Sequence, residues 1–539
     1  MKLEQIQSPV NNHLLADYWS ENAKIHSFFE YKYNEQSFQE RATYLQNKSY
    51  RPKQLANIIR EYMAPFGISE TTKQHIEELQ QGALVVVGGQ QSGLLTGPLY
   101  SVHKAISVIL LAKEQREKLN IPVVPMFWIA GEDHDLEEIN HTYTIVDGEV
   151  KKRGYSERTK LKTMASTTSL NNDALEQFVK TVFKDYGETA YTEQLLANVL
   201  SFVKDSTTFT DFFTLLMNEL FKNHGLLLLD ATYDSFREYE QPYFEILIKN
   251  NEQISKVVVT QEDHLEKAGY SKPIVASEQN ANLFYVKDGE RFLLEREEDG
   301  SFVNRLASAR FTKEELLKIA QDKPRTLSNN VVTRPLMQEM TIPVLAFVGG
   351  PGELAYWATL KPAFEILELQ MPIFAPRLNI TMVTRQVQSI LAYNNLTVMD
   401  VMTNKVEQKL ADFIESIQDK KVQQHIEQMN KQLVEQYDEL ANYLEQGDYQ
   451  LQSLMKKNKE YHEKQFYFLQ SKIKQQSLQK HNVAIRQLKI LQSELYPNGG
   501  YQERVYSPYQ YLNNYGRTLI DDLIALEMGI SNQHYIVSL

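Results

Sequence analysis

The pattern of apolar and polar positions divides the chain into helical and α/β regions. Residues 1–80 are predicted to form an N-terminal helical segment, because DYWSENAKIHSFFEYKY and KQLANIIREYM space their apolar residues as a helix does. Short apolar, β-branched runs then predict buried strands at residues 83–87, 123–129, 226–230, 344–348 and 372–375. The chain therefore begins with helices and continues as an α/β core.

The α/β core repeats one arrangement. A strand, a double glycine, a helix and a second strand follow one another from residue 83 and again from residue 344. The first helix is expected from Pro98 to Leu119, and the second from 354 to 369 with a break at Pro362. Such units predict a doubly wound parallel sheet over residues 81–389, in which ligands bind outside the carboxyl ends of the strands.

Two insertions are expected in this core. Residues 140–220 are predicted to be mostly helical. Residues 270–310 alternate in polarity and contain Asp288-Gly289 and Asp299-Gly300, both of which are hairpin signals. They predict a small antiparallel insertion.

A long helical hairpin is predicted over residues 390–495. No proline lies between Pro376 and Pro497, and Gly447 is the single glycine. Helical spacing joins Val422, Ile426, Met429, Leu433, Leu440 and Leu444, and a return helix would pass through Leu454, Phe466, Leu469, Ile473 and Leu488 to Leu495. With reversal at Gly447-Asp448, an antiparallel coiled coil results.

The last segment, residues 496–539, is rich in Tyr, Pro, Gly and Asn and then turns helical. Such a composition cannot continue a coiled coil. We expect it to pack on the α/β core.

Composition narrows the class of protein. The net charge is −12 without a Lys/Arg block, so a nucleic acid partner is not expected. No apolar run approaches the roughly 20 residues of a membrane span, and the N-terminus lacks a signal-peptide core, so we expect a cytoplasmic protein. The chain contains no cysteine, which fits either ordinary cytoplasmic composition or an enzyme that handles a thiol.

The first glycine loop, GGQQSGLLTG at residues 88–97, ends a strand and opens a helix. Free amides at a helix N-terminus favour an anion. Gly88 and Gly93 have the spacing of a phosphate-binding P-loop, but Leu94-Leu95 replaces its Lys and Ser/Thr. The loop is either an anion site of another kind or a tight turn.

Ionisable residues follow the second strand of the core. Asp133, His134 and Asp135 lie at its end, and His141 follows. Such a group could act as a general base, hold a metal, or bind ammonium and hydroxyl groups. Zinc held by His134, His141 and an aspartate is one alternative, although the spacing matches no zinc signature, and solvated acids are another.

The second glycine loop is Gly349-Gly350-Pro351-Gly352-Glu353. Glu353 could bind a substrate amine or simply favour the helix N-terminus. Arg377 and Arg504 could bind a carboxylate or phosphate, or form ordinary ion pairs within the protein.

Taken together, GGQQSGLLTGPLY, FWIAGEDHDLEEINH, VGGPGELAYW, FAPRLN and YPNGGYQER resemble the bacterial family that adds cysteine to glucosaminyl-malate in bacillithiol synthesis. The likeness covers essentially the whole chain. It implies a Rossmann-like core, a coiled coil that forms a homodimer, and a ligase whose substrates are cysteine and glucosaminyl-malate. It also implies ATP, with Mg²⁺ as a further candidate cofactor and an acyl-phosphate or acyl-adenylate as the activated form. The core looks similar to class I aminoacyl-tRNA synthetases, but neither of their signature motifs is present.

The resemblance and the loops together assign roles to residues. Catalysis is expected from Asp133, His134 and Asp135. Substrate binding is expected from Gln90, Gln91, Ser92, Gly93, Thr96, Arg377 and Asn379. Contacts to the nucleotide are expected from Gly349, Gly350, Gly352, Glu353 and Arg504, and no protein metal site is assigned. The alternative is a dimeric nucleotide-binding scaffold or sensor without catalysis.

Overall fold

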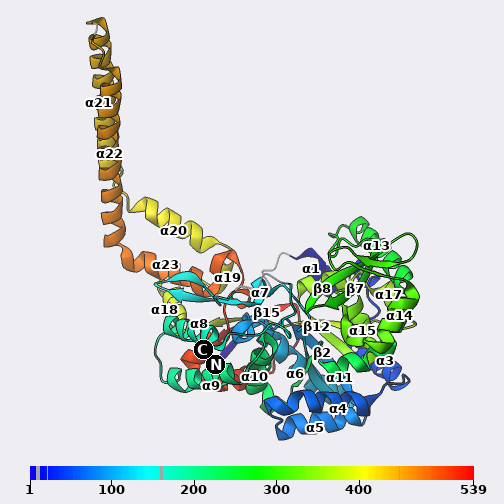
Figure 1. The fold of residues 1–539 in the computed structure, drawn as a ribbon. Coiled ribbons are helices and arrows are strands. Elements are labelled where there is room, and N and C mark those ends of the chain that lie inside the picture. The colour runs from blue at the N-terminus through cyan, green and yellow to red at the C-terminus, as the bar shows by residue number, and fades with distance from the viewer. Residues whose placement is uncertain (8–11, 21, 158–161, 448) are drawn as a thin grey trace. The chain divides into compact units, whose positions relative to one another are not determined.

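The chain forms two compact units in the computed structural model, which describes residues 1–7, 12–20, 22–157, 162–447 and 449–539 (Figure 1). The first unit contains residues 1–146, 150–383 and 500–539, and the second contains residues 147–149 and 384–499. The N-terminal helices and the C-terminal segment thus belong to the same unit as the α/β core.

The first unit is built on a parallel sheet with the order β13-β12-β2-β3-β6. Its strands are β2 (Leu84–Gln90), β3 (Val123–Ile129), β6 (Leu227–Asp230), β12 (Val344–Gly349) and β13 (Ile373–Pro376). Each forms where a strand was predicted, and every residue of β3 is buried, as in a sheet covered on both faces. The doubly wound, Rossmann-like fold class is confirmed.

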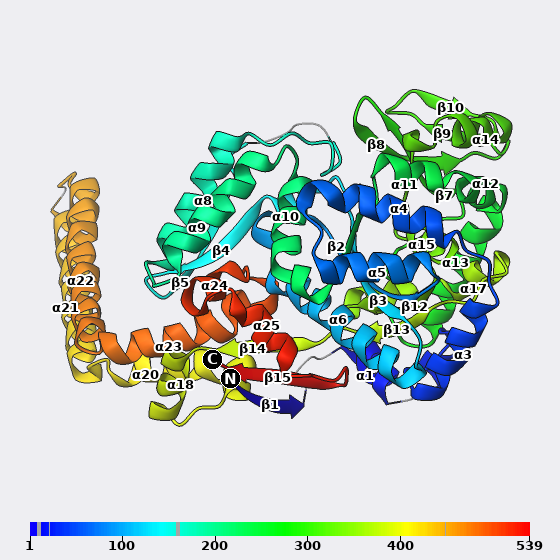
Figure 2. The same cartoon turned by 90° about the horizontal axis from the view of Figure 1, so that it is seen from below.

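Helices pack against this sheet (Figure 2). The predicted helix after the first glycine loop is confirmed as α6 (Leu99–Leu119). The predicted break at Pro362 separates α16 (Pro351–Trp357) from α17 (Lys361–Ile366). The other helices of the core are α1 (His13–Trp19), α2 (Ala23–His26), α3 (Glu35–Gln46), α4 (Pro52–Met63), α5 (Glu70–Gln80), α7 (Leu136–Ile139), α11 (Asp234–Tyr239), α12 (Gln241–Lys249), α13 (Asn251–Lys267), α14 (Lys313–Asp322), α15 (Thr333–Thr341), α24 (Tyr509–Tyr515) and α25 (Thr518–Ala525).

The insertion after β3 differs from its prediction. It contains the helices α8 (Asn172–Tyr186), α9 (Thr192–Asp205) and α10 (Phe209–Phe221), but it begins with β4 (His141–Val146) and β5 (Glu149–Gly154). Asp147 and Gly148, between these strands, both have positive φ, at 54° and 78°. Asp-Gly at that position is a hairpin signal that the helical interpretation overlooked.

The antiparallel insertion is confirmed. It has the order β10-β9-β8-β7-β11, with β7 (Asn280–Lys287), β8 (Glu290–Arg296), β9 (Phe302–Asn304), β10 (Ala309–Phe311) and β11 (Leu327–Asn329). Asp288 and Gly289 turn the chain between β7 and β8 with φ of 52° and 81°.

A third sheet was not predicted. It has the order β1-β15-β14, with β1 (Lys2–Gln7), β15 (Gln533–Ser538) and β14 (Asn379–Val383). The prediction was wrong in treating residues 1–80 as helical throughout and in ending the chain with a helix. Both errors have one cause, since β1 pairs with β15 at the other end of the chain and local patterns carry no information on such pairing.

The second unit contains the predicted hairpin, formed by α21 (Lys420–Gln446) and α22 (Gln452–Lys480). Lys459 Nζ lies 2.6 Å from the Asp438 carboxylate, which links the two helices in antiparallel register. The return helix is interrupted, because α22 ends at Lys480 and α23 (Asn482–Leu495) follows as a separate helix. The remaining helices of this unit are α18 (Arg385–Tyr393), α19 (Val398–Met402) and α20 (Lys405–Ser416).

Fewer apolar residues are buried between the two helices of the hairpin than predicted. Ile426 is buried, but four of the predicted seam residues, Met429, Leu440, Leu454 and Leu469, are exposed. Of the predicted reversal point, Asp448 lies outside the described residues. In the described part of the chain, no helix has the length and apolar character needed to span a membrane.

Candidate active site

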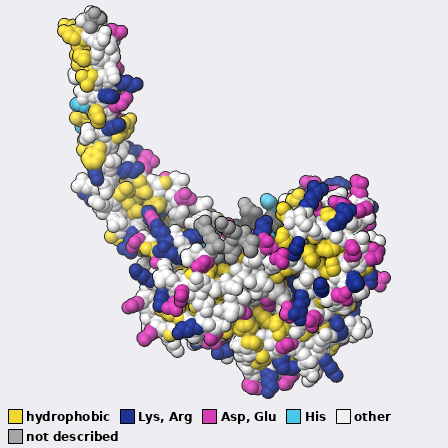
Figure 3. Space-filling model, in the orientation of Figure 1, with side chains coloured by type: hydrophobic (Ala, Val, Ile, Leu, Met, Phe, Trp, Pro, Cys, Tyr) yellow, Lys and Arg dark blue, Asp and Glu magenta, His cyan; other side chains and the backbone are white. Residues whose placement is uncertain are grey.

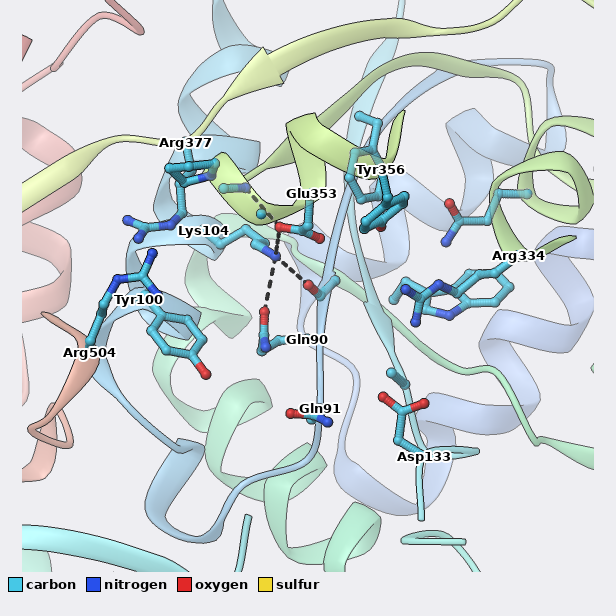
Figure 4. A pocket seen from close by; sticks show the side chains of 18 residues that line it. Gln90, Gln91, Tyr100, Lys104, Asp133, Arg334, Glu353, Tyr356, Arg377 and Arg504 are labelled. Carbon is cyan, nitrogen blue, oxygen red and sulfur yellow. Dashed lines mark hydrogen bonds and ion pairs between the residues drawn. The ribbon is translucent and has the colours of Figure 1, made fainter. Parts of the chain in front are cut away.

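A cavity of about 350 Å³ opens at the carboxyl ends of the central strands, beside β2 and β12 (Figure 4). From β2 the chain continues to β3 on one side, and from β12 it continues to β13 on the other, so this is the topological switch point of the sheet. Eight of the predicted site residues line the cavity: Gln90, Gln91, Asp133, Gly350, Gly352, Glu353, Arg377 and Arg504.

The first glycine loop reaches the cavity through its glutamines. β2 runs through Gly88 and Gly89 to Gln90, and a side chain at Gly89 would collide with the backbone of Trp128 on β3. The glycines thus allow close packing inside the sheet. Gln90 and Gln91 line the cavity beyond them, and the Gln91 amide donates to Glu138 at 3.1 Å.

The rest of this loop lies away from the cavity. Ser92 and Thr96 are fully buried, and the Thr96 hydroxyl donates to the Leu95 carbonyl at 2.6 Å. At Gly93, a Cβ would lie 2.7 Å from the Gly97 Cα. These three residues, for which substrate contacts were predicted, do not line the cavity, and the surrounding protein fills the space next to them.

The amides at the start of α6 are also partly used. The Leu99 N–H donates to the Tyr506 carbonyl at 2.8 Å, and Pro98 has no N–H. The predicted anion cradle at this helix N-terminus is therefore occupied in part by the C-terminal segment.

The second glycine loop presents Glu353 to the cavity. The Gly350 N–H donates to Glu353 Oε2 at 2.8 Å, which caps the short helix α16. Gly349 does not line the cavity, and a Cβ added there would meet the ring of Phe374 at 2.6 Å. Glu353 thus caps its helix and still faces the cavity.

Lys104 of α6 joins the two glycine loops. Its ammonium is buried and donates to the Gly89 carbonyl at 2.7 Å, to Gln90 Oε1 at 3.0 Å and to Glu353 Oε2 at 2.7 Å. Burial lowers the pKa of Lys104, although Glu353 opposes this. Since all three donors are used within the protein, Lys104 positions Gln90 and Glu353.

Asp133 is the one member of the predicted catalytic group that lines the cavity. Burial raises its pKa against the opposing charges of Arg334 and Arg291, and Arg291 Nη1 lies 3.6 Å from its carboxylate. His134 lies next to it, with its ring 5.9 Å from that of Phe284, and burial together with Arg291 lowers its pKa. Asp135 is exposed.

The metal alternative was based on His134, His141 and an aspartate. His141 lies at the start of β4, where its Nδ1 is 3.0 Å from the Glu137 carbonyl. Among the described residues, no three His, Asp or Glu side chains are grouped to hold a metal ion. A Mg²⁺ ion would have to take oxygen ligands from a bound substrate as well as from the protein.

Arg377 forms an ion pair within the protein, which was one of the two interpretations of this residue from the sequence. Its guanidinium donates to both oxygens of Glu503, at 2.8 and 2.5 Å, and both side chains are buried. Burial alone would raise the pKa of Glu503, but Arg377 and His103 outweigh it and hold the pKa well below its usual value. This pair attaches the C-terminal segment beside the cavity.

Arg504 follows Glu503 and faces the cavity. Among the described residues, its side chain forms no ion pair or hydrogen bond. Asn379 does not line the cavity, because it begins β14 and pairs with His534 in the third sheet. Its predicted substrate contact therefore has no support from the geometry of this cavity.

The residues that line the cavity without having been predicted include Tyr100, Lys104, Trp128, Arg334 and Tyr356. Lys104 had a recognisable signal, because it is a single charge within the apolar run of α6. Arg334 had none, since it lies near the start of α15, at neither a strand end nor a glycine loop.

Charge distinguishes this cavity from a larger one at the end of β6. The first is lined by four cations and two carboxylates. The second, of about 630 Å³, is lined by five carboxylates and by two arginines, Arg237 and Arg325, that are each paired with acids. An anionic ligand is therefore favoured in the first cavity.

The sheet order and the cavity at its switch point define an α/β protein of the Rossmann-like class with a small-molecule site. Residues 1–378 match the family model described as the N-terminal Rossmann-like domain of bacillithiol biosynthesis BshC, and residues 380–539 match that of its C-terminal coiled-coil domain. The chain belongs to the BshC family.

Full-length relatives agree with this assignment. A protein of Lysinibacillus sphaericus named "Putative cysteine ligase BshC" is 55% identical over 539 residues and covers 100% of both chains. Proteins of the same name from Geobacillus kaustophilus and Bacillus licheniformis are 39% and 34% identical, again over 100% of both chains.

Proposed function

We propose that this protein is an ATP-dependent ligase that joins the carboxyl group of cysteine to the amine of glucosaminyl-malate, the last step of bacillithiol synthesis. The observation that carries the proposal is the cationic cavity at the switch point of a chain whose full-length relatives are named cysteine ligases. Malate, a cysteine carboxylate and a triphosphate are all anions that suit such a cavity.

The reaction needs activation and proton removal. ATP would supply the activation of the cysteine carboxylate. The amine nitrogen then forms a bond to the carboxyl carbon, the activated oxygen leaves, and the nitrogen loses a proton. Asp133 faces the cavity and is the candidate acceptor of that proton, with His134 beside it.

Other residues of the cavity suit an anionic group. Arg504 forms no ion pair among the described residues, and Gln90 and Gln91 offer amide donors. The proposal places the nucleotide or the malate end near Arg504 and the second glycine loop.

The test is a complete reaction mixture. Purified protein with ATP, cysteine and glucosaminyl-malate should form a new thiol whose mass is that of the two substrates less one water. Omitting any one of the three should abolish the product. Nucleotide binding without product would instead support the alternative, a nucleotide-binding scaffold or sensor.

We also propose that the chain forms a homodimer through α21 and α22. Support comes from the exposed apolar side chains on these helices, including Met429, Leu440, Leu454, Tyr461 and Phe468. Figure 3 shows hydrophobic side chains recurring along the hairpin. Such exposed apolar residues mark a surface that a partner covers.

A further inference from the structure

Two of the four cations that line the cavity are held by partners within the protein. Lys104 donates to Gly89, Gln90 and Glu353. Arg377 is bound by both oxygens of Glu503. A ligand anion would have to compete with these partners, so it is expected to bind elsewhere in the cavity.

Arg334 differs from these two cations. It lies near the start of α15 and faces the cavity, and it forms no ion pair among the described residues. Burial opposes its charge, but Tyr356, Asp133, Glu132 and Glu353 outweigh burial and raise its pKa. The guanidinium is therefore charged when it lines the cavity.

The carboxylates near Arg334 are directed to other partners. Glu132 pairs with Arg237 and accepts from Ser328. Asp133 lies 3.6 Å from Arg291, and Glu353 lies 2.7 Å from Lys104. These carboxylates keep Arg334 charged without accepting hydrogen bonds from it. The Tyr356 hydroxyl interacts with one edge of the guanidinium, and the rest of this planar group is available for a group with two oxygens.

We propose that Arg334 binds a carboxylate or phosphate group of a substrate, at a point separate from Arg504. This inference rests on the proposed function for the nature of the ligands. In Figure 4, Arg334 and Asp133 lie on one side of the cavity, and Arg504, Arg377 and Tyr100 lie on the other, with Glu353 and Gln90 between them. The cavity thus recognises two separate anionic groups.

The separation has a consequence for the reaction. An anion held by Arg334 lies on the same side as Asp133, the candidate proton acceptor. A cysteine carboxylate or its phosphate donor at that point would be next to the group that accepts the amine proton. The group at Arg504 would then belong to the other ligand.

The test measures binding directly, by titration calorimetry on the full-length protein with cysteine, L-malate, ATP and inorganic phosphate as separate probes. Arg334→Gln should weaken the binding of at least one probe about tenfold or more, because a charge-assisted, two-oxygen contact is lost. Arg504→Gln should leave that probe unchanged and weaken another. The probe that depends on Arg334 tells whether a carboxylate or a phosphate binds there.

Two further variants complete the design. Arg334→Lys keeps the charge and loses the planar geometry, so it should weaken the same probe by a smaller factor; it serves as the test if Arg334→Gln does not fold. Arg310→Gln removes an exposed arginine on β10, outside the cavity, and should change nothing.

The inference is overturned if Arg334→Gln binds every probe as the wild type does. It is also overturned if both arginine variants weaken the same probe equally, or if the wild type binds none of the probes. Because no product is needed, a failure of the ligase reaction with intact Arg334-dependent binding would count against the proposed function alone.

Discussion

At the scale of single residues, Lys104 links the two glycine loops. Its three hydrogen bonds connect the end of β2 with the start of α16, on either side of the switch point. A buried ammonium loses much of its hydration, and complete hydrogen bonding compensates for that loss. The same contacts hold Gln90 and Glu353 where they line the cavity.

Lys104→Met is expected to lower the free energy of unfolding by about 1–3 kcal/mol, because Gly89 and Glu353 lose a buried partner. Glu353→Gln alone should cost less, since Glu353 is partly exposed. The two changes together should cost less than the sum of the single changes. Denaturant unfolding of all four proteins measures this coupling. Additive effects would show that the pair does not hold the loops together.

Asp133 and His134 are expected to assist proton removal. Asp133→Asn and His134→Asn should each reduce turnover at least about tenfold with little change in melting temperature. Burial raises the pKa of Asp133, and a proton acceptor must be deprotonated. Activity should therefore fall with decreasing pH at a higher pH than an ordinary aspartate would give. Near-normal turnover at saturating substrate in both variants would move the catalytic assignment elsewhere.

At the scale of elements, the loop from Gly93 to Gly97 is a packed turn, with Leu95 and Thr96 at positive φ. Gly93→Ala is expected to destabilise the protein by about 1–3 kcal/mol, because the added Cβ would overlap the Gly97 backbone. Gly352→Ala is the matched control, since nothing lies within 4 Å of its Cβ position. Equal unfolding free energies for the two variants would contradict the packed-turn interpretation.

The third sheet contains a buried histidine. His534 lies on β15, with its Nε2 2.8 Å from the Thr381 hydroxyl, and burial lowers its pKa to about 4 despite the opposing charge of Glu503. The unfolded chain takes up a proton near pH 6.5, whereas the folded chain does so only near pH 4. Stability should therefore decrease as the pH falls between these values, by on the order of 3 kcal/mol.

His534→Gln should reduce this loss of stability on acidification. His462→Gln, an exposed position on α22, is the control and should leave it unchanged. Urea unfolding at pH 7 and pH 5 compares the three proteins. The same pH dependence in wild type and His534→Gln would exclude His534 as its source.

At the scale of the whole molecule, the hairpin should determine oligomeric state. Deleting roughly residues 420–475 and joining the ends is expected to convert a dimer into a monomer by light scattering, because it removes the exposed apolar side chains of α21 and α22. Leu440→Lys with Leu454→Lys tests the same surface in the full-length chain. A wild-type protein that is already monomeric at micromolar concentration would refute the proposal.

Local patterns in the sequence were sufficient to predict the central strands, α6 and the long helices of the hairpin. These elements carry their signal in consecutive residues, as β-branched runs, glycine pairs or helical spacing. Gln90, Gln91, Asp133, Gly350, Gly352, Glu353, Arg377 and Arg504 were predictable for the same reason, since they lie at strand ends, beside glycines or in a recognisable motif.

Features that depend on contacts between distant segments of the chain could be seen only in the tertiary structure. It paired β1 with β15, brought Glu503 to Arg377, and placed Lys104 and Arg334 at the switch point. It also buried Ser92 and Thr96, which the loop sequence had presented as ligand contacts. Spacing along the chain specifies which face of a helix or strand a residue occupies. The residue that packs against it comes from another segment, which can be hundreds of positions away, so local spacing does not identify it.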